Sequence, residues 1–253
     1  MNKMWPKCQS LCLQLIAMAA LFVAASLASA QTQDQDTDRD GFTDAEETAG
    51  IVLSDGTIFS GCVSGADRTT CLDPLTSDFF VTLVPASRSL IPSDATQFIR
   101  NLIGEGVHEI TADQAGPNRQ VTASQKAIRI TESLDTNDTL WGISLFQGTP
   151  NTAGEAIVFT QRISDKINQV YTDAGSFPPP GVIEKCIRHT YAHEGGHNMN
   201  IRFETDRSGE NHYSTRDQVV MSTSVTIKVK GSNVSVNCPD QYADPDFVDF
   251  RLQ

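Results

Sequence analysis

The sequence is poor in positive charge and in long apolar runs. Lysine and arginine together number 19 against 31 acidic residues, so the formal net charge is −12. A chain this acidic repels nucleic acid and anionic membranes, and we expect neither as a partner. Beyond the first 30 residues, no segment is apolar enough to cross a bilayer. Internal repeats and low-complexity tracts are also missing, and the length supports one sizeable core with a small appendage.

Cysteine is scarce, and the C-x-x-C spacing of a zinc–cysteine site does not occur. Cys8 and Cys12 lie within the first 30 residues, which leaves four cysteines in the rest of the chain. An even number in an exported chain predicts two disulfides. Three pairings are possible, and we favour the short loop Cys62–Cys71 together with Cys186–Cys238.

The N-terminus has the pattern of a secretory signal peptide. Lys3 and Lys7 precede the apolar run 11–27, and Ala28-Ser29-Ala30 forms a small-residue cleavage site before Gln31. We expect residues 1–30 to be removed and the protein to be secreted or periplasmic. A membrane anchor is the alternative, since the run is nearly long enough to span a bilayer. Loss of two lysines leaves 17 basic and 31 acidic residues in 31–253, a net charge of −14.

An acidic loop dominates the segment 31–75. The run "DTDRDGFTDAEE" spaces its acids as calcium-binding loops do, with Gly41 allowing a sharp turn. It resembles EF-hand, thrombospondin type 3 and dockerin loops, although only a short helix after the loop is expected, with none before it. An acidic solvated linker is the alternative interpretation. The expected calcium ligands are Asp36, Asp38, Asp40, Phe42 through its carbonyl, Asp44 and Glu47.

Residues 76–253 alternate between strand and helix patterns. Apolar runs predict strands, an amphipathic pattern with Gly104 as its stop predicts a helix at 93–106, and 162–171 is a second helix candidate. A helix over 182–203 and a hairpin around "GSN" follow. We therefore expect an α+β fold with a mixed sheet. The expected strands are 79–84, 126–130, 142–146 and 156–160.

The run "HEGGH" indicates a possible zinc site. On a helix, His193 and His197 share one face and can bind one zinc ion, while Glu194 lies one step round, where it can act as a base. The alternatives are a helix that carries these residues by chance and a closed structural zinc site.

A zinc site of this kind needs a third protein ligand, and the chain has only five histidines. His189 and His197 are eight residues apart, about 12 Å along a straight helix, which is too far for one zinc ion. His108 lies far upstream. This leaves His212, with Glu204 and Glu210 as carboxylate alternatives.

The order of "HEGGH", "HY" and "VVMS" resembles the zincin metalloproteases, and most closely their metzincin branch. That branch follows H-E-x-x-H-x-x-G-x-x-H with a methionine turn beneath the zinc. Here Asn200 and Phe203 stand where the pattern has its glycine and third histidine, which excludes a ligand at the short spacing. The resemblance implies a zincin-like domain at 76–253 and makes Met221 the candidate for the methionine turn.

Together these features predict an exported zinc endopeptidase acting on peptides or proteins, with Glu194 as general base. Tyr213 is a candidate donor to the developing oxyanion, and strand 156–160 is expected to be an edge to which an extended substrate adds. The alternative is a non-enzymatic, calcium-stabilised surface or adhesion module whose H-E-x-x-H motif is vestigial or structural. A zinc hydrolase acting on other substrates is a third possibility.

Overall fold

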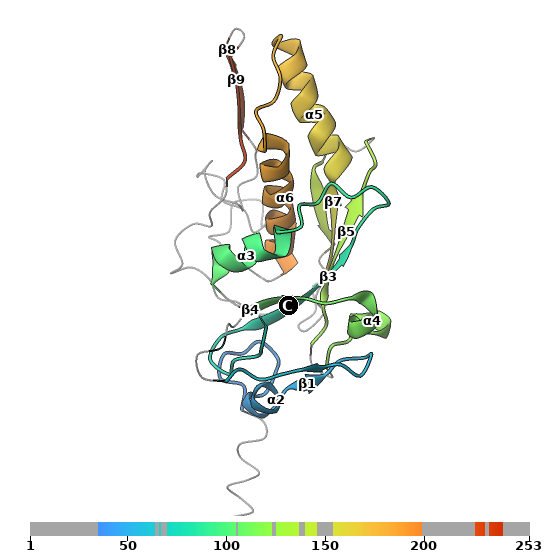
Figure 1. Ribbon diagram of the computed structural model, residues 1–253, viewed down its shortest axis with the longest axis vertical. Helices are drawn as coiled ribbons and strands as arrows, with labels where there is room; N and C mark the ends of the chain where they lie inside the picture. The colour runs from blue at the N-terminus through green and yellow to red at the C-terminus, as the bar shows by residue number, and fades with distance from the viewer. Residues whose placement is uncertain are drawn as a thin grey trace, which may run out of the picture.

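The computed structural model describes residues 35–63, 66, 70–104, 106–122, 125–136, 140–145, 154–198, 226–230 and 233–239. The expected signal peptide lies outside these ranges, as do His212 and its alternatives Glu204 and Glu210. The described part is α+β, as the sequence predicted, and is built on one mixed five-stranded sheet with two small hairpins (Figure 1).

The main sheet has the order β4-β3-β5-β7-β6. Its four neighbouring strands β4, β3, β5 and β7 run parallel, and only β6 runs antiparallel, at the edge beyond β7. The expected edge at 156–160 is therefore wrong: β7 is paired on both sides, and β6 is the edge. The strands are β3 (Asp78–Val84), β4 (Gly106–Glu109), β5 (Ile128–Ser133), β6 (Gly142–Leu145) and β7 (Glu155–Phe159).

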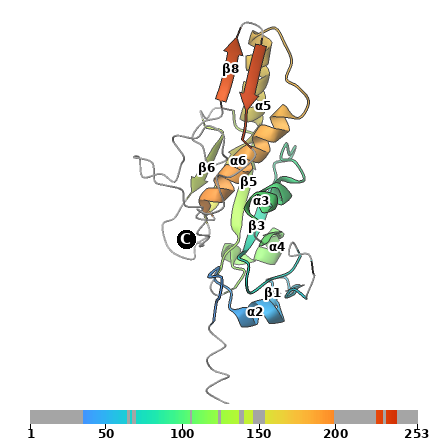
Figure 2. The same cartoon turned by 90° about the vertical axis from the view of Figure 1, so that its left-hand side faces the viewer.

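Three longer helices supply the apolar side chains of one face. Helix α3 (Ala95–Ile103) ends at Gly104, as the sequence predicted, and Gly104 adopts a left-handed conformation (φ 73°). The other two are α5 (Thr160–Asp173) and α6 (Val182–Asn198). Figure 2 shows α3 and α6 lying across the sheet on the side that faces the viewer. Helix α6 contacts β7, β6 and β5, which brings the H-E-x-x-H run to the antiparallel edge.

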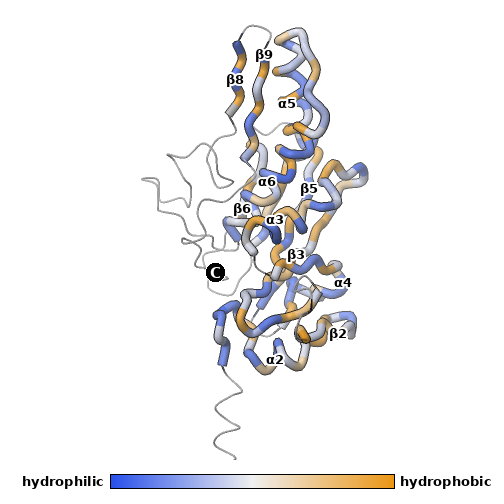
Figure 3. The backbone as a smooth tube through the Cα atoms, turned by 60° about the vertical axis from the view of Figure 1, so that its left-hand side comes forward, coloured by the Kyte–Doolittle hydropathy of each residue, from blue (hydrophilic) through white to orange (hydrophobic). Residues whose placement is uncertain are grey.

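Because side chains point alternately to the two faces of the sheet, the buried apolar residues form two clusters. Phe79 and Val81 of β3 join the cluster formed with α3, α5 and α6, whereas Phe80, between them, joins a second cluster on the other side. Figure 3 shows hydrophobic segments along β3 and β5 in the middle of the molecule.

The second cluster includes the segment that follows the acidic loop. Phe42 packs edge-on against Phe80 at 5.7 Å between ring centroids, and both are buried. The segment also forms α2 (Asp44–Ala49) and the hairpin β1 (Ile51–Val52) and β2 (Ile58–Phe59), while α4 (Ala112–Ala115) and the 3-10 turn η1 (Pro117–Arg119) follow β4. Residues on both sides of the expected boundary at 75/76 thus share one apolar cluster. The boundary itself stays a prediction.

Two disulfides confirm the predicted pairing: Cys62 is joined to Cys71, and Cys186 to Cys238. The second ties α6 to the end of the antiparallel hairpin of β8 (Thr226–Lys230) and β9 (Asn233–Asn237), which the sequence also predicted. Disulfides are compatible with an extracellular protein. Among the described residues, no helix has both the length and the apolar character that a membrane span requires.

Candidate functional site

Helix α6 is fixed on several sides before it reaches the H-E-x-x-H run. Cys186 is buried in its disulfide, and the buried Tyr191 hydroxyl lies 3.1 Å from the Thr96 hydroxyl of α3. Arg188 forms an ion pair with Asp94, at 2.8 Å. The helix is therefore held against α3 and the sheet, and its last two turns have a defined position.

The two predicted zinc ligands are brought together at the end of α6. The Nε2 atoms of His193 and His197 lie 3.2 Å apart, and both rings are partly exposed. Two ligand atoms in tetrahedral positions on one zinc ion, each at 2.0–2.1 Å, would be about 3.3 Å apart. The separation of the two nitrogen atoms therefore matches that of two ligands on one zinc ion.

Glu194 faces the edge strand β6. A Cβ atom at Gly142 would lie 2.5 Å from Glu194 Oε1 and 2.6 Å from its Cγ, so the glycine makes room for this side chain. Glu194 is 6% exposed, and burial raises the pKa of its carboxyl to about 8. A cation close by would lower that pKa again, because it favours the ionised form.

A small polar network joins the end of α6 to β6. Asn198 Nδ2 donates to the Glu194 carbonyl at 2.9 Å and to Ser144 Oγ at 2.7 Å. Gly154, ahead of β7, lies so close to the Asn198 amide that no Cβ fits there. Sequence reasoning missed Gly142, Ser144 and Asn198, and the only local signal was a glycine at the start of a predicted strand.

The two other described histidines, His189 and His108, each have a partner elsewhere in the fold. His189 is buried, and its Nδ1 donates to the Pro239 carbonyl at 2.9 Å, so that this ring is held at the C-terminal segment. His108 lies on β4 and pairs with Asp78, away from α6. His212, the expected third ligand, lies outside the described residues, as do its alternatives and Tyr213 and Met221.

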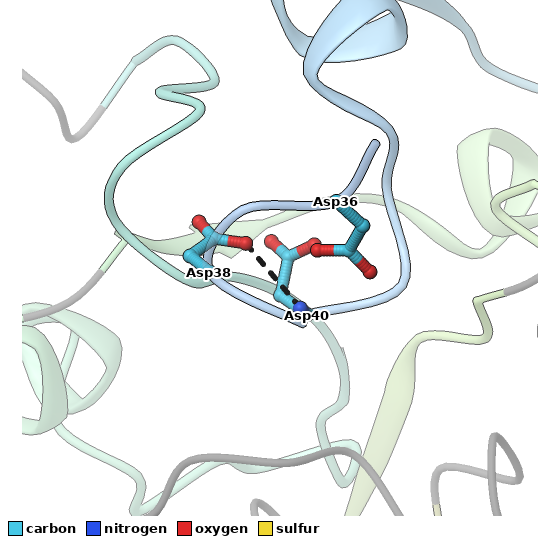
Figure 4. Close-up of side chains that lie close together, drawn as sticks. All are labelled: Asp36, Asp38 and Asp40. Carbon is cyan, nitrogen blue, oxygen red and sulfur yellow. Dashed lines mark hydrogen bonds between the residues drawn. The ribbon is translucent and has the colours of Figure 1, made fainter. Parts of the chain in front are cut away.

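The acidic loop forms a compact cluster of carboxylates. Asp36, Asp38 and Asp40 each place an oxygen within 4.8 Å of the other two (Figure 4). Asp36 accepts from the backbone N–H groups of Arg39 at 2.6 Å and Gly41 at 3.1 Å, which closes the turn. Their spacing is compatible with a shared cation, and calcium binding by these three residues stays a prediction.

The two other carboxylates among the predicted calcium ligands, Asp44 and Glu47, have different surroundings. Both oxygens of Asp44 are engaged by Thr37, which donates its N–H and its hydroxyl, each at 2.8 Å. Asp44 thus closes the loop. Glu47 points into the protein instead and is fully buried.

A residue that the sequence did not indicate completes the cluster. Asp78, the first residue of β3, lies with Asp40 and Glu47, and an oxygen of each is within 4.8 Å of the others. All three are at most 1% exposed. The available signal was an acid directly ahead of the buried run "FFVTLV", which does not reveal what the acid meets.

Burial and mutual repulsion perturb these groups strongly. Burial is the main cause that raises the pKa of Asp38 to about 7, of Asp40 to about 8 and of Glu47 to about 10, and neighbouring carboxylates add to each. Burial likewise raises the pKa of Asp78, against the opposing effect of His108. A cation bound among these carboxylates would favour their ionised forms and lower these pKa values.

Comparisons with known proteins add no assignment: no family model, no curated protein and no solved structure matches this chain.

Proposed function

We propose that the protein is an exported zinc-dependent endopeptidase with its active site at the end of α6. The observation that carries the proposal is the 3.2 Å separation of the Nε2 atoms of His193 and His197, with Glu194 on the same helix turn. Two imidazoles at zinc-ligand spacing and an adjacent carboxylate form the ligand and base set of metallopeptidases with this motif.

His193 and His197 would hold the zinc ion, with a third ligand from the segment after α6. On the sequence argument that ligand is His212, and Glu204 or Glu210 would give a two-histidine, one-carboxylate set instead. Bound zinc supplies Lewis acidity, which lowers the pKa of water and polarises a carbonyl.

The role of Glu194 is proton transfer. Its carboxylate accepts the proton of the attacking water and later donates it to the leaving amine. The contact with Gly142 fixes the side chain beside β6, and the hydrogen bonds of Asn198 and Ser144 to the Glu194 carbonyl hold the helix end in place. The base is thereby positioned before substrate arrives.

The free edge of β6 supports a peptide as the substrate. Among the described strands, β6 pairs only with β7, and no described strand lies at its other edge. An extended peptide can add to such an edge through main-chain hydrogen bonds. Because Gly142 of β6 touches Glu194, a peptide bound there would pass beside the base.

The test compares Glu194→Gln with the native chain. We expect the variant to keep its zinc, measured by elemental analysis, and to lose casein hydrolysis by about 100-fold or more, because only the base is removed. Glu184→Gln is the matched control: this exposed residue lies on the same helix, and its replacement should change neither quantity. Full hydrolysis by Glu194→Gln would contradict the proposal.

The buried acidic cluster favours a second candidate, a non-enzymatic calcium-stabilised module. A calcium titration of the native chain, added to the same experiment, separates the two functions. A native chain that binds calcium but neither retains zinc nor hydrolyses casein would support the module.

A further inference from the structure

Three segments that are separate in the sequence meet at one buried point. Asp40 comes from the acidic loop, Glu47 from α2 and Asp78 from β3, and each has an oxygen within 4.8 Å of the others. Calcium binds oxygen at 2.3–2.6 Å, so opposite ligands of one ion lie up to about 5 Å apart. The three carboxylates are thus close enough to share one coordination sphere.

Glu47 provides an independent indication that a ligand belongs here. Its side chain is fully buried, and within the described part of the chain neither carboxylate oxygen has a hydrogen-bond partner. A buried carboxylate without a partner is costly, and buried polar groups are almost always satisfied. Among the described residues, the only basic side chain bonded to any of the clustered acids is His108, which contacts Asp78 and not Glu47.

The surrounding chain is shaped to hold Asp78 in place. Asp78 Oδ1 lies 2.6 Å from His108 Nε2, and Oδ2 accepts from the Asp73 N–H at 2.9 Å. At Gly106 a Cβ would collide with the Asp78 carboxylate, so the glycine is part of the site. The carboxylate is therefore oriented by β4 and by the turn before β3.

The acidic loop is joined to the strand by further buried bonds. The Asp78 N–H donates to Asp40 Oδ2 at 2.6 Å. Gln125 Nε2 donates to the backbone carbonyls of both Asp40 and Asp78, each at 3.0 Å, and Gln125 is buried. The two acids are thus tied together by backbone and side chain, even though 38 residues separate them.

We propose that Asp40, Glu47 and Asp78 bind one calcium ion inside the fold, so that the ion joins the acidic loop to the main sheet. Asp78 is the ligand that the loop pattern lacks, and Asp44 closes the loop through Thr37. Asp36 and Asp38 add negative charge beside the site. Calcium fits better than magnesium, which is usually bound through one or two carboxylates. This inference does not depend on the zinc site.

The ion would stabilise the segment around α2 as part of the core. Phe42 and Leu72 pack with Phe80 in one apolar cluster, and Phe42 and Phe80 are near neighbours in sequence of the acids Asp40 and Asp78. Separation of the acidic loop from β3 would therefore open this apolar contact. Calcium binding to the folded state alone would raise the melting temperature by mass action.

The experiment measures calcium binding to the EGTA-treated full chain by titration calorimetry. We expect Asp78→Asn to weaken binding by about tenfold to hundredfold, because it removes a charged ligand of the same shape. Asp55→Asn, which removes an exposed acid from the β1–β2 turn, should leave the affinity unchanged. Asp44→Asn should weaken binding less than Asp78→Asn does.

Two further variants cover the case in which Asp78→Asn fails to fold. Gly106→Ala keeps every acid but displaces the Asp78 carboxylate, and it should weaken calcium binding in the same direction. Glu47→Gln should melt at a higher temperature than the native chain in EGTA, because without calcium the native chain must take up a proton to bury the Glu47 carboxyl and the amide need not. Melting of this variant should no longer respond to calcium. Native affinity in Asp78→Asn, or a native calcium response in Glu47→Gln, would overturn the proposal, as would absence of calcium binding by the native chain.

Discussion

Glu194 lies directly against Gly142, so that the base proposed for the active site and the edge strand proposed for substrate binding are in contact. No side chain larger than hydrogen fits at position 142 without displacing the carboxylate. The position of Glu194 therefore depends on β6 as much as on α6.

Gly142→Ala tests this dependence. The added methyl group should push the Glu194 carboxylate from its place and lower kcat/KM for casein peptides by about 100-fold, while zinc content stays native. Leu140→Ala is the control, since it changes an exposed residue just before the same strand. Native activity in Gly142→Ala would show that the contact does not position the base.

Glu132 gives a prediction for the dependence of stability on pH. Burial alone would raise the pKa of Glu132, but hydrogen bonds from Ser89, Leu90, Thr160 and Ala86 hold it below the usual glutamate value. The unfolded chain then binds the proton more readily than the folded chain does. The stabilisation is fully present above the ordinary glutamate pKa and is lost as pH falls through the folded value.

Glu132→Gln should accordingly lower the free energy of unfolding by about 2 kcal/mol at pH 7, and the difference from the native chain should shrink in acid. Urea unfolding at pH 7 and at pH 3 measures both values. Glu184→Gln, an exposed change, should cost less than about 1 kcal/mol at either pH. A difference that grows in acid would contradict the assigned sign.

The two disulfides should contribute unequally to stability. Cys186–Cys238 spans 52 residues and Cys62–Cys71 spans 9. Loop entropy predicts that double serine replacement costs about 4 kcal/mol for the first and about 2.5 kcal/mol for the second. Urea unfolding of the two double variants measures this order, and a larger loss at the shorter loop would refute it.

Sequence patterns predicted the elements that are long enough to show a clear pattern of apolar and polar residues. Residues 79–82 of the run at 79–84 are buried on both faces of the sheet, which explains why the run has no alternation of apolar and polar residues. The amphipathic helix before Gly104 and the hairpin around residues 231–232 were predicted from periodicity and turn chemistry. The shorter elements β1, β2 and α4 span two to four residues, too few to give a period.

The order of the strands could not be read from local pattern. Strand β7 was expected at the edge, yet Ala156 and Val158 are fully buried, as suits a strand paired on both sides. Strand β6 is the more exposed one. The apolar character of "AIVF" was the signal that should have placed β7 inside the sheet.

At the two candidate sites, residues close in sequence were predicted and a residue distant in sequence was missed. His193, Glu194 and His197 were found because helix geometry relates residues four apart. Asp78 was missed because its partners in the loop and α2 are more than 30 residues away, and only the folded chain brings them together.

The most direct test of the account is the zinc content of single alanine variants, measured by elemental analysis after dialysis. The account predicts about one zinc per native chain, and loss of most of it in His193→Ala, His197→Ala and His212→Ala. His189→Ala and His108→Ala should keep it, since these rings are held by Pro239 and Asp78. Loss of zinc in Glu204→Ala or Glu210→Ala, with zinc retained in His212→Ala, would show that the third ligand is a carboxylate and not His212. A native chain without zinc would contradict the account.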